Sequence, residues 1–484
     1  MKILNTLSGQ KEEFEPIQDK KVGMFVCGPT VYDWSHIGHA RTYVIFDIIS
    51  KYLRSKGHKV KFIMNITDID DKIIERARNE GKSWKEIADF FEKEFMADMN
   101  ALYIKVDKFA KATDHIKEII KQISALVKKS YAYEIEGEGV YFDISKFEDY
   151  GKLSKRTVEQ AEDAVSRIDE SVSKRNKGDF VLWKFSTAIP QPAYGGAEPS
   201  TSTADEPSWD SPWGKGRPGW HIEDTAISEK YLGKQYEIHC GGRDLAFPHH
   251  EAEIAQQEAA SGKNPFVKYW LHSGFVTVDG QKMSKSLGNF ITIREVLQEY
   301  PPEALRFMIA SSHYRSPVAY SEDLIKSSEA AIQRIIELKD KLDLLKKSSN
   351  AEDLDIGVEN LIKTAREKFE EKMDDDFNTP EAVAVIFDFI RMVNGLIDEN
   401  KISKKSADKI LKFIEELDKV LGVIPEKKSI PAEISKLVQT REKLRKNKEW
   451  LEADKIRDRI QEGGYSIEDT LYGPLVKKSL EHRI

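Results

Sequence analysis

Residues 21–64 constrain the fold more than any other segment, because they are typical of a strand, a helix and a second strand in succession. The apolar run at residues 21–26 ends at turn-forming residues. A helical pattern follows at residues 36–56, and the apolar run at residues 60–64 predicts the next strand. A unit of this size predicts a right-handed parallel crossover. Ligands of such sheets bind beyond the carboxyl ends of the strands, so we expect a site near Cys27.

The pattern changes twice along the rest of the chain. A polar segment and a stretch rich in Ala, Pro, Gly, Ser and Thr (residues 186–205) interrupt the α/β pattern, and the chain becomes helical after residue 320. We predict an α/β fold with a Rossmann-type parallel sheet, followed by an all-α bundle and a small C-terminal domain. The predicted domains are residues 1–318, with a connective insertion at about 110–205 and a loop region at 275–318, then 319–424 and 431–484. The 186–205 loop receives no role.

Composition narrows the class of protein. The 484 residues carry a net charge of -7, so a nucleic-acid surface would have to be a local basic patch. Only two cysteines are present, Cys27 and Cys240, which argues against a disulfide framework and favours a reducing compartment. No apolar run has membrane-spanning length, and the N-terminus does not resemble a signal peptide. We therefore expect a cytoplasmic protein, with no membrane partner.

His36 and His39 lie three residues apart at the start of the predicted helix, so they share one face. Gly38 removes a side chain between them, which lets an adenine or a phosphate approach the backbone. The helix N-terminus adds a partial positive charge toward an anion. We infer that the histidines stabilise charge on an α-phosphate. Without a partner motif, two surface histidines would be the better interpretation.

The partner motif is the loop that contains Lys282 and Lys285. Gly280 and Gly288 flank it, which suits a loop that closes over a bound nucleotide. The two lysines can neutralise the β- and γ-phosphates as pyrophosphate leaves. A solvated surface loop would explain the lysines alone, but not the apolar Met283 between them.

A second cluster follows Pro248, which fits a first helical position. His249 and Glu253 are then four residues apart on one helical face, a spacing able to hold a metal ion. A thiolate from Cys27, at a strand end, would be a third ligand. On these residues alone, a polar helix start is the better interpretation.

Gly242 and Asp244 follow another predicted strand, residues 236–239. Small residues at a strand end permit close approach of a nucleotide, and Asp244 can accept hydrogen bonds from ribose hydroxyls. A plain tight turn explains the segment equally well.

Taken together, these motifs resemble those of the cysteinyl-tRNA synthetases, a class I family. The histidine and lysine motifs form the paired signature of enzymes that activate amino acids with ATP, and the likeness covers nearly the whole chain. The other matching segments are residues 25–33, 65–72, 179–184, 216–223, 247–253, 374–380 and 453–458.

The resemblance implies a ligase that forms cysteinyl-adenylate and passes cysteine to the 3′ end of cysteine tRNA. It also implies one Zn²⁺ per chain, which binds the substrate thiolate, and ATP with Mg²⁺. Catalysis would fall to His36, His39, Lys282 and Lys285. The implied ATP-binding residues are Gly28, His36, Gly38, His39, Gly242, Asp244 and Lys285. Thr67 and Trp220 would line the amino-acid pocket, and Cys27, His249 and Glu253 would bind zinc.

One departure from the family concerns the fourth zinc ligand. The family usually places a second cysteine where this chain has Asp224. Asp224 could bind zinc through oxygen, at the usual distance of about 2.0–2.2 Å. Cys240 could supply the thiolate instead, or zinc could bind weakly or be absent. We favour Asp224, because it preserves the charge of the ligand and needs no change in the backbone.

The implied tRNA-binding regions are the helical bundle and the C-terminal domain. Residues 441–459 contain eight basic and five acidic residues, a local basic stripe on an acidic protein. Trp450 could stack on a base, but we expect it to pack with Ala453 and Ile456. Without the resemblance, a solvated charged helix would be the better interpretation of this stripe.

Two other functions remain open from the sequence. A paralogous enzyme that joins cysteine to an amino sugar would share the zinc pocket but would need no anticodon domain. A non-catalytic RNA-binding descendant would not need the histidine and lysine motifs. Nothing in the sequence demands a dimer, and we expect a monomer.

Overall fold

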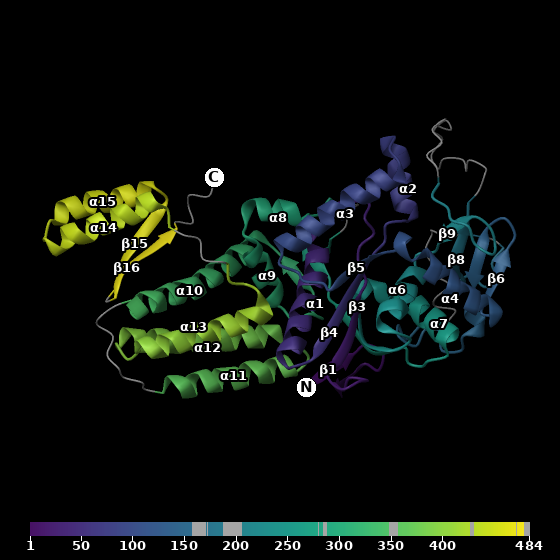
Figure 1. Ribbon diagram of the computed structural model, residues 1–484, viewed down its shortest axis with the longest axis horizontal. Helices are drawn as coiled ribbons and strands as arrows, with labels where there is room; N and C mark the ends of the chain where they lie inside the picture. Colours follow the sequence, from purple (N-terminus) through teal and green to yellow (C-terminus); the bar gives the residue numbers. More distant parts are fainter. Residues whose placement is uncertain are drawn as a thin grey trace. The chain divides into compact units, whose positions relative to one another are not determined.

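The computed structural model describes residues 1–156, 171, 173–186, 206–278, 280–283, 288–347, 357–425, 430–470 and 472–478 (Figure 1). It divides into two compact units. The first unit is Met1–Ile325 with Lys372–Pro380, and the second is Lys326–Glu371 with Glu381–Ile484. The predicted boundaries of three domains stay a prediction.

A five-stranded parallel sheet forms the centre of the first unit. Its strand order is β11-β10-β3-β4-β5, and all four pairings are parallel. The strands are β3 (Lys21–Val26), β4 (Lys59–Ile66), β5 (Lys108–Lys111), β10 (Tyr236–Gly242) and β11 (Val267–Ser273). The predicted crossover helix is α1 (Ile37–Ser55), between β3 and β4 in sequence. From β3 the sheet grows on one side through β4 and β5, and on the other side of β3 through β10 and β11. The strand order therefore reverses between β3 and β10, and ligands of such sheets bind at this position.

The remaining elements of the first unit surround this sheet. An antiparallel sheet of order β6-β7-β8-β9 arises mostly from the predicted insertion. The elements before and within it are β1 (Lys2–Asn5), β2 (Gln10–Glu13), α2 (Asp71–Glu80), α3 (Trp84–Ala101), α4 (Ile116–Lys128), β6 (Ala132–Ile135), β7 (Gly139–Phe142), β8 (Phe180–Phe185) and β9 (Gly216–Pro218). Helices α6 (Ile222–Leu232) and α7 (His249–Ser261) follow and lie beside each other (Figure 1). Most of the 186–205 loop lies outside the described residues.

The last part of the first unit carries the predicted lysine loop. Strand β12 (Val276–Val278) pairs with β13 (Gln281–Lys282) and with β14 (Val318–Tyr320). Helices α8 (Ile293–Glu299) and α9 (Pro302–Ala310) lie between β13 and β14 in sequence. Lys285 and the side chain of Lys282 lie outside the described residues.

Most of the second unit is helical, as predicted. Helices α10 (Glu322–Lys347), α11 (Val358–Asp374), α12 (Thr379–Asp398) and α13 (Lys404–Leu421) run alongside one another (Figure 1). Their apolar stripes are buried; Leu338, Leu342 and Leu345 of α10 are examples. The C-terminal part contains α14 (Ala432–Lys446), α15 (Trp450–Glu462), β15 (Tyr465–Thr470) and β16 (Gly473–Lys478). Among the described residues, no helix is long and apolar enough to cross a membrane.

Candidate functional site

Potential metal ligands gather at the predicted edge of the parallel sheet. Cys27 directly follows β3, and the first turns of α6 and α7 bring acidic and imidazole groups to its sulfur. Within the described residues, two groups of four place their ligand atoms within 4.8 Å of one another. Cys27 and Glu253 belong to both groups, and all the members are buried.

The first group joins the predicted ligands Cys27, Asp224, His249 and Glu253. His249 Nε2 lies 3.0 Å from Asp224 Oδ2 and 3.0 Å from Glu253 Oε1. Cys27 Sγ lies 3.7 Å from the same oxygen of Glu253. His249 and Glu253 meet because residues four apart share a face of α7. One sulfur, one imidazole nitrogen and two carboxylate oxygens are thus close enough to surround a single divalent ion.

The electrostatics of this group favour a cation. Burial opposes the charge on His249, but the nearby Glu253 and Asp224 carboxylates outweigh it and raise its pKa to about 10. Burial, and then repulsion by Glu253, raises the pKa of the Cys27 thiol. Glu253 Oε2 accepts no hydrogen bond within the described part of the chain. Buried negative charge with an unsatisfied oxygen is costly unless a positive ion compensates it, so these residues fit a bound metal.

Neighbouring side chains orient Asp224 and His249. Asn65 donates through Nδ2 to Asp224 Oδ1 at 2.5 Å, which leaves Oδ2 directed at His249. The Nδ1 atoms of His249 and His221 are 2.8 Å apart, and this contact sets the orientation of the His249 ring. Such contacts are typical of the residues that support metal ligands.

Cys240, the alternative to Asp224, belongs to neither group. Its residue pairs with Val26 across β10 and β3. Paired residues point to the same face of a sheet and successive residues to opposite faces, so the Cys240 side chain is directed away from the Cys27 face. The structure therefore brings Asp224, and not Cys240, to the candidate metal site.

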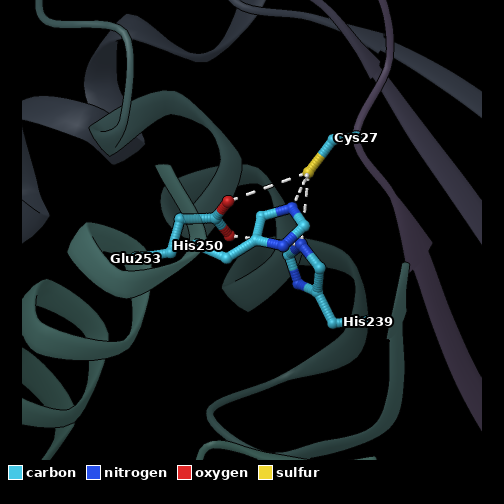
Figure 2. Close-up of side chains that lie close together, drawn as sticks. All are labelled: Cys27, His239, His250 and Glu253. Carbon is cyan, nitrogen blue, oxygen red and sulfur yellow. Dashed lines mark hydrogen bonds and ion pairs between the residues drawn. The ribbon is translucent and has the colours of Figure 1, made fainter. Parts of the chain in front are cut away.

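The second group joins Cys27 and Glu253 to His239 and His250 (Figure 2). Both Nε2 atoms lie 3.2 Å from the Cys27 sulfur, and that of His239 lies 3.4 Å from Glu253 Oε2. Burial lowers the pKa of both imidazoles, so they are neutral at pH 7.

Neither His239 nor His250 is among the site residues predicted from the sequence. His239 was part of a predicted strand, and His250 was the unassigned neighbour of His249. No sequence signal identifies His239, because it reaches Cys27 only through the pairing of β10 with β3.

The two predicted substrate-binding residues lie next to the first group. The Trp220 ring stacks on His249, with ring centroids 4.4 Å apart, and Trp220 remains 38% exposed. Thr67 is buried and donates a hydrogen bond to Glu223, the neighbour of Asp224. The partly exposed Trp220 ring therefore covers His249 of the candidate metal site, and Thr67 lies beside Glu223, next to Asp224.

His36 caps the helix that it precedes. Its Nδ1 accepts hydrogen bonds from the backbone N–H groups of Gly38, at 3.0 Å, and His39, at 3.3 Å. His39 Nδ1 in turn accepts from the His36 N–H at 3.3 Å, and the two rings stack with centroids 3.8 Å apart. Because each Nδ1 is an acceptor, each neutral ring carries its proton on Nε2. Burial lowers the pKa of His36 to about 4 and lowers that of His39 as well.

Two predicted glycines allow close contacts at the site. A side chain at Gly38 would begin 2.8 Å from the His36 ring, so this glycine makes room for the cap itself. A side chain at Gly28 would begin 1.8 Å from the Asn65 carbonyl oxygen. The Gly28 N–H donates to Asn65 Oδ1 at 2.6 Å, which joins the ends of β3 and β4. Gly242 ends β10, and Asp244 lies in the short 3₁₀ turn Arg243–Ala246.

The packing prediction for Trp450 is wrong. Trp450 is 56% exposed and Leu451 is 81% exposed, whereas Ala453 on the same helix is buried. Trp450 begins α15, where the first turn projects its side chain away from the small core of this region. The Arg445 guanidinium lies 6.0 Å from the Trp450 ring centroid. The basic stripe is also partly neutralised, because Arg441 forms two hydrogen bonds with Asp469, at 2.8 and 2.9 Å.

Comparison with known proteins gives family matches along most of the chain. Residues 13–330 match the model of the class I (C) tRNA synthetase catalytic domain. Residues 368–425 match the DALR domain, and residues 427–473 match the cysteinyl-tRNA ligase anticodon binding domain.

Individual proteins agree with these matches. A cysteine–tRNA ligase from Thermodesulfovibrio yellowstonii is 46% identical, over 97% of this chain and 98% of the relative. Two solved structures share the fold at low identity. Mycobacterium tuberculosis methionyl-tRNA synthetase in complex with methionyl-adenylate is 14% identical with a TM-score of 0.59, covering 83% of this chain and 88% of that one. The LeuRS–tRNA–LeuAMS ternary complex of Agrobacterium radiobacter K84 is 12% identical with a TM-score of 0.60, covering 85% of each chain. The predicted α/β fold is thereby confirmed, and the chain belongs to the cysteine–tRNA ligase family of class I tRNA synthetases.

Proposed function

We propose that this chain activates L-cysteine with ATP and transfers the cysteinyl group to the 3′ end of cysteine tRNA. The observation that carries the proposal is the buried group of Cys27, Asp224, His249 and Glu253, whose His249 ring stacks on Trp220. A pocket of this kind suits an amino acid whose side chain is itself a metal ligand. Membership of the family supplies the class of reaction.

We assign one Zn²⁺ to this group, held by the four side chains. When bound, zinc is a Lewis acid that would bind the substrate thiol as a thiolate. A serine hydroxyl is a poorer zinc ligand than a thiolate. A site that binds one group in this way can reject an analogue by roughly 10⁴–10⁵ without proofreading. Thr67 borders the amino-acid pocket, and the Trp220 ring covers His249 and excludes water from it.

In the first step, the carboxylate of cysteine attacks the α-phosphorus of ATP, and the bond to pyrophosphate breaks. His36 and His39 direct neutral Nε2–H donors at the charge that develops on the phosphoryl oxygens. Loss of one such donor typically costs about 3–4 kcal/mol of barrier. Lys282 and Lys285 would neutralise the departing pyrophosphate, whose Mg²⁺ arrives with ATP. Gly28, Gly242 and Asp244 would hold the nucleotide.

In the second step, a ribose hydroxyl of the terminal tRNA nucleotide attacks the carbonyl of the adenylate, and AMP leaves. The helical bundle and the C-terminal region would bind the tRNA. The exposed Trp450 beside Arg445 offers an aromatic surface for an unstacked base. The family matches at residues 368–425 and 427–473 support a tRNA substrate over an amino sugar.

The test uses the purified full-length chain. Cysteine-dependent exchange of pyrophosphate into ATP should occur, with serine at least about 10⁴-fold poorer by kcat/KM. Charging of cysteine tRNA should follow, and metal analysis should find about one zinc per chain. Exchange without charging of any tRNA would instead indicate an amino-sugar ligase, and tRNA binding without exchange would indicate a non-catalytic protein.

A further inference from the structure

The sulfur of Cys27 has two neighbours that the proposed metal site does not use. His239 and His250 both direct Nε2 at Sγ from 3.2 Å (Figure 2). We propose that His239 and His250 are positioning residues that donate two N–H···S hydrogen bonds to the metal-bound thiolate of Cys27 and thereby weaken its electron donation to the ion. This inference rests on the proposed function, because it concerns the same metal site.

The first donor is fixed by Tyr236. The Tyr236 hydroxyl lies 2.7 Å from His239 Nδ1, and both side chains are buried. A phenol that donates to Nδ1 leaves the single proton of a neutral imidazole on Nε2. His239 also stacks on Trp270, with centroids 4.4 Å apart, so the ring cannot turn away easily. Tyr236 therefore directs an N–H at the sulfur through His239.

The second donor is fixed by a longer relay. The Thr6 hydroxyl lies 2.9 Å from His272 Nδ1, and His272 Nε2 lies 2.8 Å from His250 Nδ1. If Thr6 donates, His272 carries its proton on Nε2 and donates to His250. His250 then carries its own proton on Nε2, which faces Cys27. The two relays share no residue; both end at the sulfur, where the His239 and His250 rings lie 4.8 Å apart, centroid to centroid.

The donor and acceptor roles could also be reversed along both relays. His239 and His250 would then present lone pairs and, with Cys27 and Glu253, would form a second set of metal ligands. A metal-bound thiolate decides between the two directions, because its negative charge attracts an N–H and repels a lone pair. When His239 and His250 donate to the sulfur, every buried nitrogen of both relays has a hydrogen-bond partner. Asp224 and His249 then complete the ligand set with Cys27 and Glu253.

The consequence concerns the electron density at the metal. Hydrogen bonds to a ligating sulfur draw charge from it, and this is a known means by which proteins adjust metal centres. Cys27 is the only sulfur ligand in the proposed set, because Asp224 offers oxygen. When electron donation from the one thiolate is reduced and two of the other ligands are carboxylates, the ion binds a further soft ligand more strongly. The substrate thiol is that ligand.

The test replaces zinc with Co²⁺ in the full-length chain, because Co²⁺ gives a sulfur-to-metal charge-transfer band and separate d–d bands. The variant Tyr236→Phe removes the first relay and Thr6→Val the second, and neither residue belongs to the proposed ligand set. Each change should shift the charge-transfer band to longer wavelength and leave the d–d bands in place. The shifts should add in the double variant. Tyr269→Phe is the matched control and should shift nothing, because within the described residues its hydroxyl bonds to backbone atoms of Glu13 and Glu15.

Three results separate the possible failures. A charge-transfer band that stays in place in both variants would overturn the hydrogen-bonding role. Altered d–d bands, with Co²⁺ affinity reduced more than about 100-fold in His239→Phe, would show that the histidines are ligands and would also overturn it. A native chain that binds no Co²⁺ through sulfur and shows no cysteine-dependent exchange would instead refute the proposed function itself.

Discussion

Asp224→Asn tests the central assignment of the metal site. The change keeps the size of the side chain and its contact with Asn65, because an amide oxygen can accept the hydrogen bond that now reaches Oδ1 at 2.5 Å. The other end of the side chain, 3.0 Å from His249 Nε2, becomes an NH₂ group that cannot bind a cation. Removal of one partner from a buried, hydrogen-bonded charge cluster typically costs about 3–5 kcal/mol.

At 1.36 kcal/mol for each factor of ten, this cost predicts a loss of zinc affinity of roughly 10²–10⁴-fold. The assay is competition with a chelator of known affinity, in parallel with KM for cysteine in pyrophosphate exchange. The matched variant Asp224→Cys keeps a negative ligand and should hold zinc at least as tightly as the native chain. Zinc affinity within about fivefold of native in Asp224→Asn would refute the assignment of Asp224 as a ligand.

Three further outcomes are expected. Trp450→Ala should raise KM for tRNA by roughly 5- to 150-fold, from a stacking contribution of about 1–3 kcal/mol, and leave pyrophosphate exchange unchanged; equal losses in both assays would contradict this role. Burial raises the pKa of Asp98 to about 6, so the folded state binds its proton more tightly than the unfolded state, and its contribution to stability is lost as pH rises from about 4 to 6. Between pH 5 and pH 8 this loss is about 1.4 kcal/mol, so denaturation at the two pH values should show a pH dependence smaller by about that amount in Asp98→Asn. The rate of pyrophosphate exchange should show no ionisation of His36 between about pH 5.5 and 8, since its pKa of about 4 keeps it neutral there.

The sequence predicted the parallel sheet because its strands are short apolar runs bounded by turn residues, as at Lys21–Val26. The resemblance to the family implied that Cys27, His249 and Glu253 would meet, whereas local geometry alone gave only the shared helical face of His249 and Glu253. The partners that depend on distant pairing were beyond such reasoning. His239 reaches the sulfur only because β10 pairs with β3, a contact between residues more than 200 positions apart.

Residue type was also a poor guide at exposed positions. Trp450 was expected to pack with Ala453 and Ile456, because aromatic side chains usually bury most of their surface. The helix α15 begins at Trp450 itself, so no preceding turn exists for the ring to cover. The capping role of His36 was likewise hidden, because Ser, Thr, Asp and Asn are the residues that normally predict a helix cap.

The opposite orientations of Cys27 and Cys240 affect how the protein withstands oxidation. Neighbouring thiols in an emptied metal site readily oxidise to a disulfide, which blocks the return of the ion. Here the two cysteines lie on adjacent strands but on opposite faces of the sheet, so a disulfide between them would require the strands to separate. Loss of the ion should therefore leave Cys27 without an internal disulfide that would block the return of the metal.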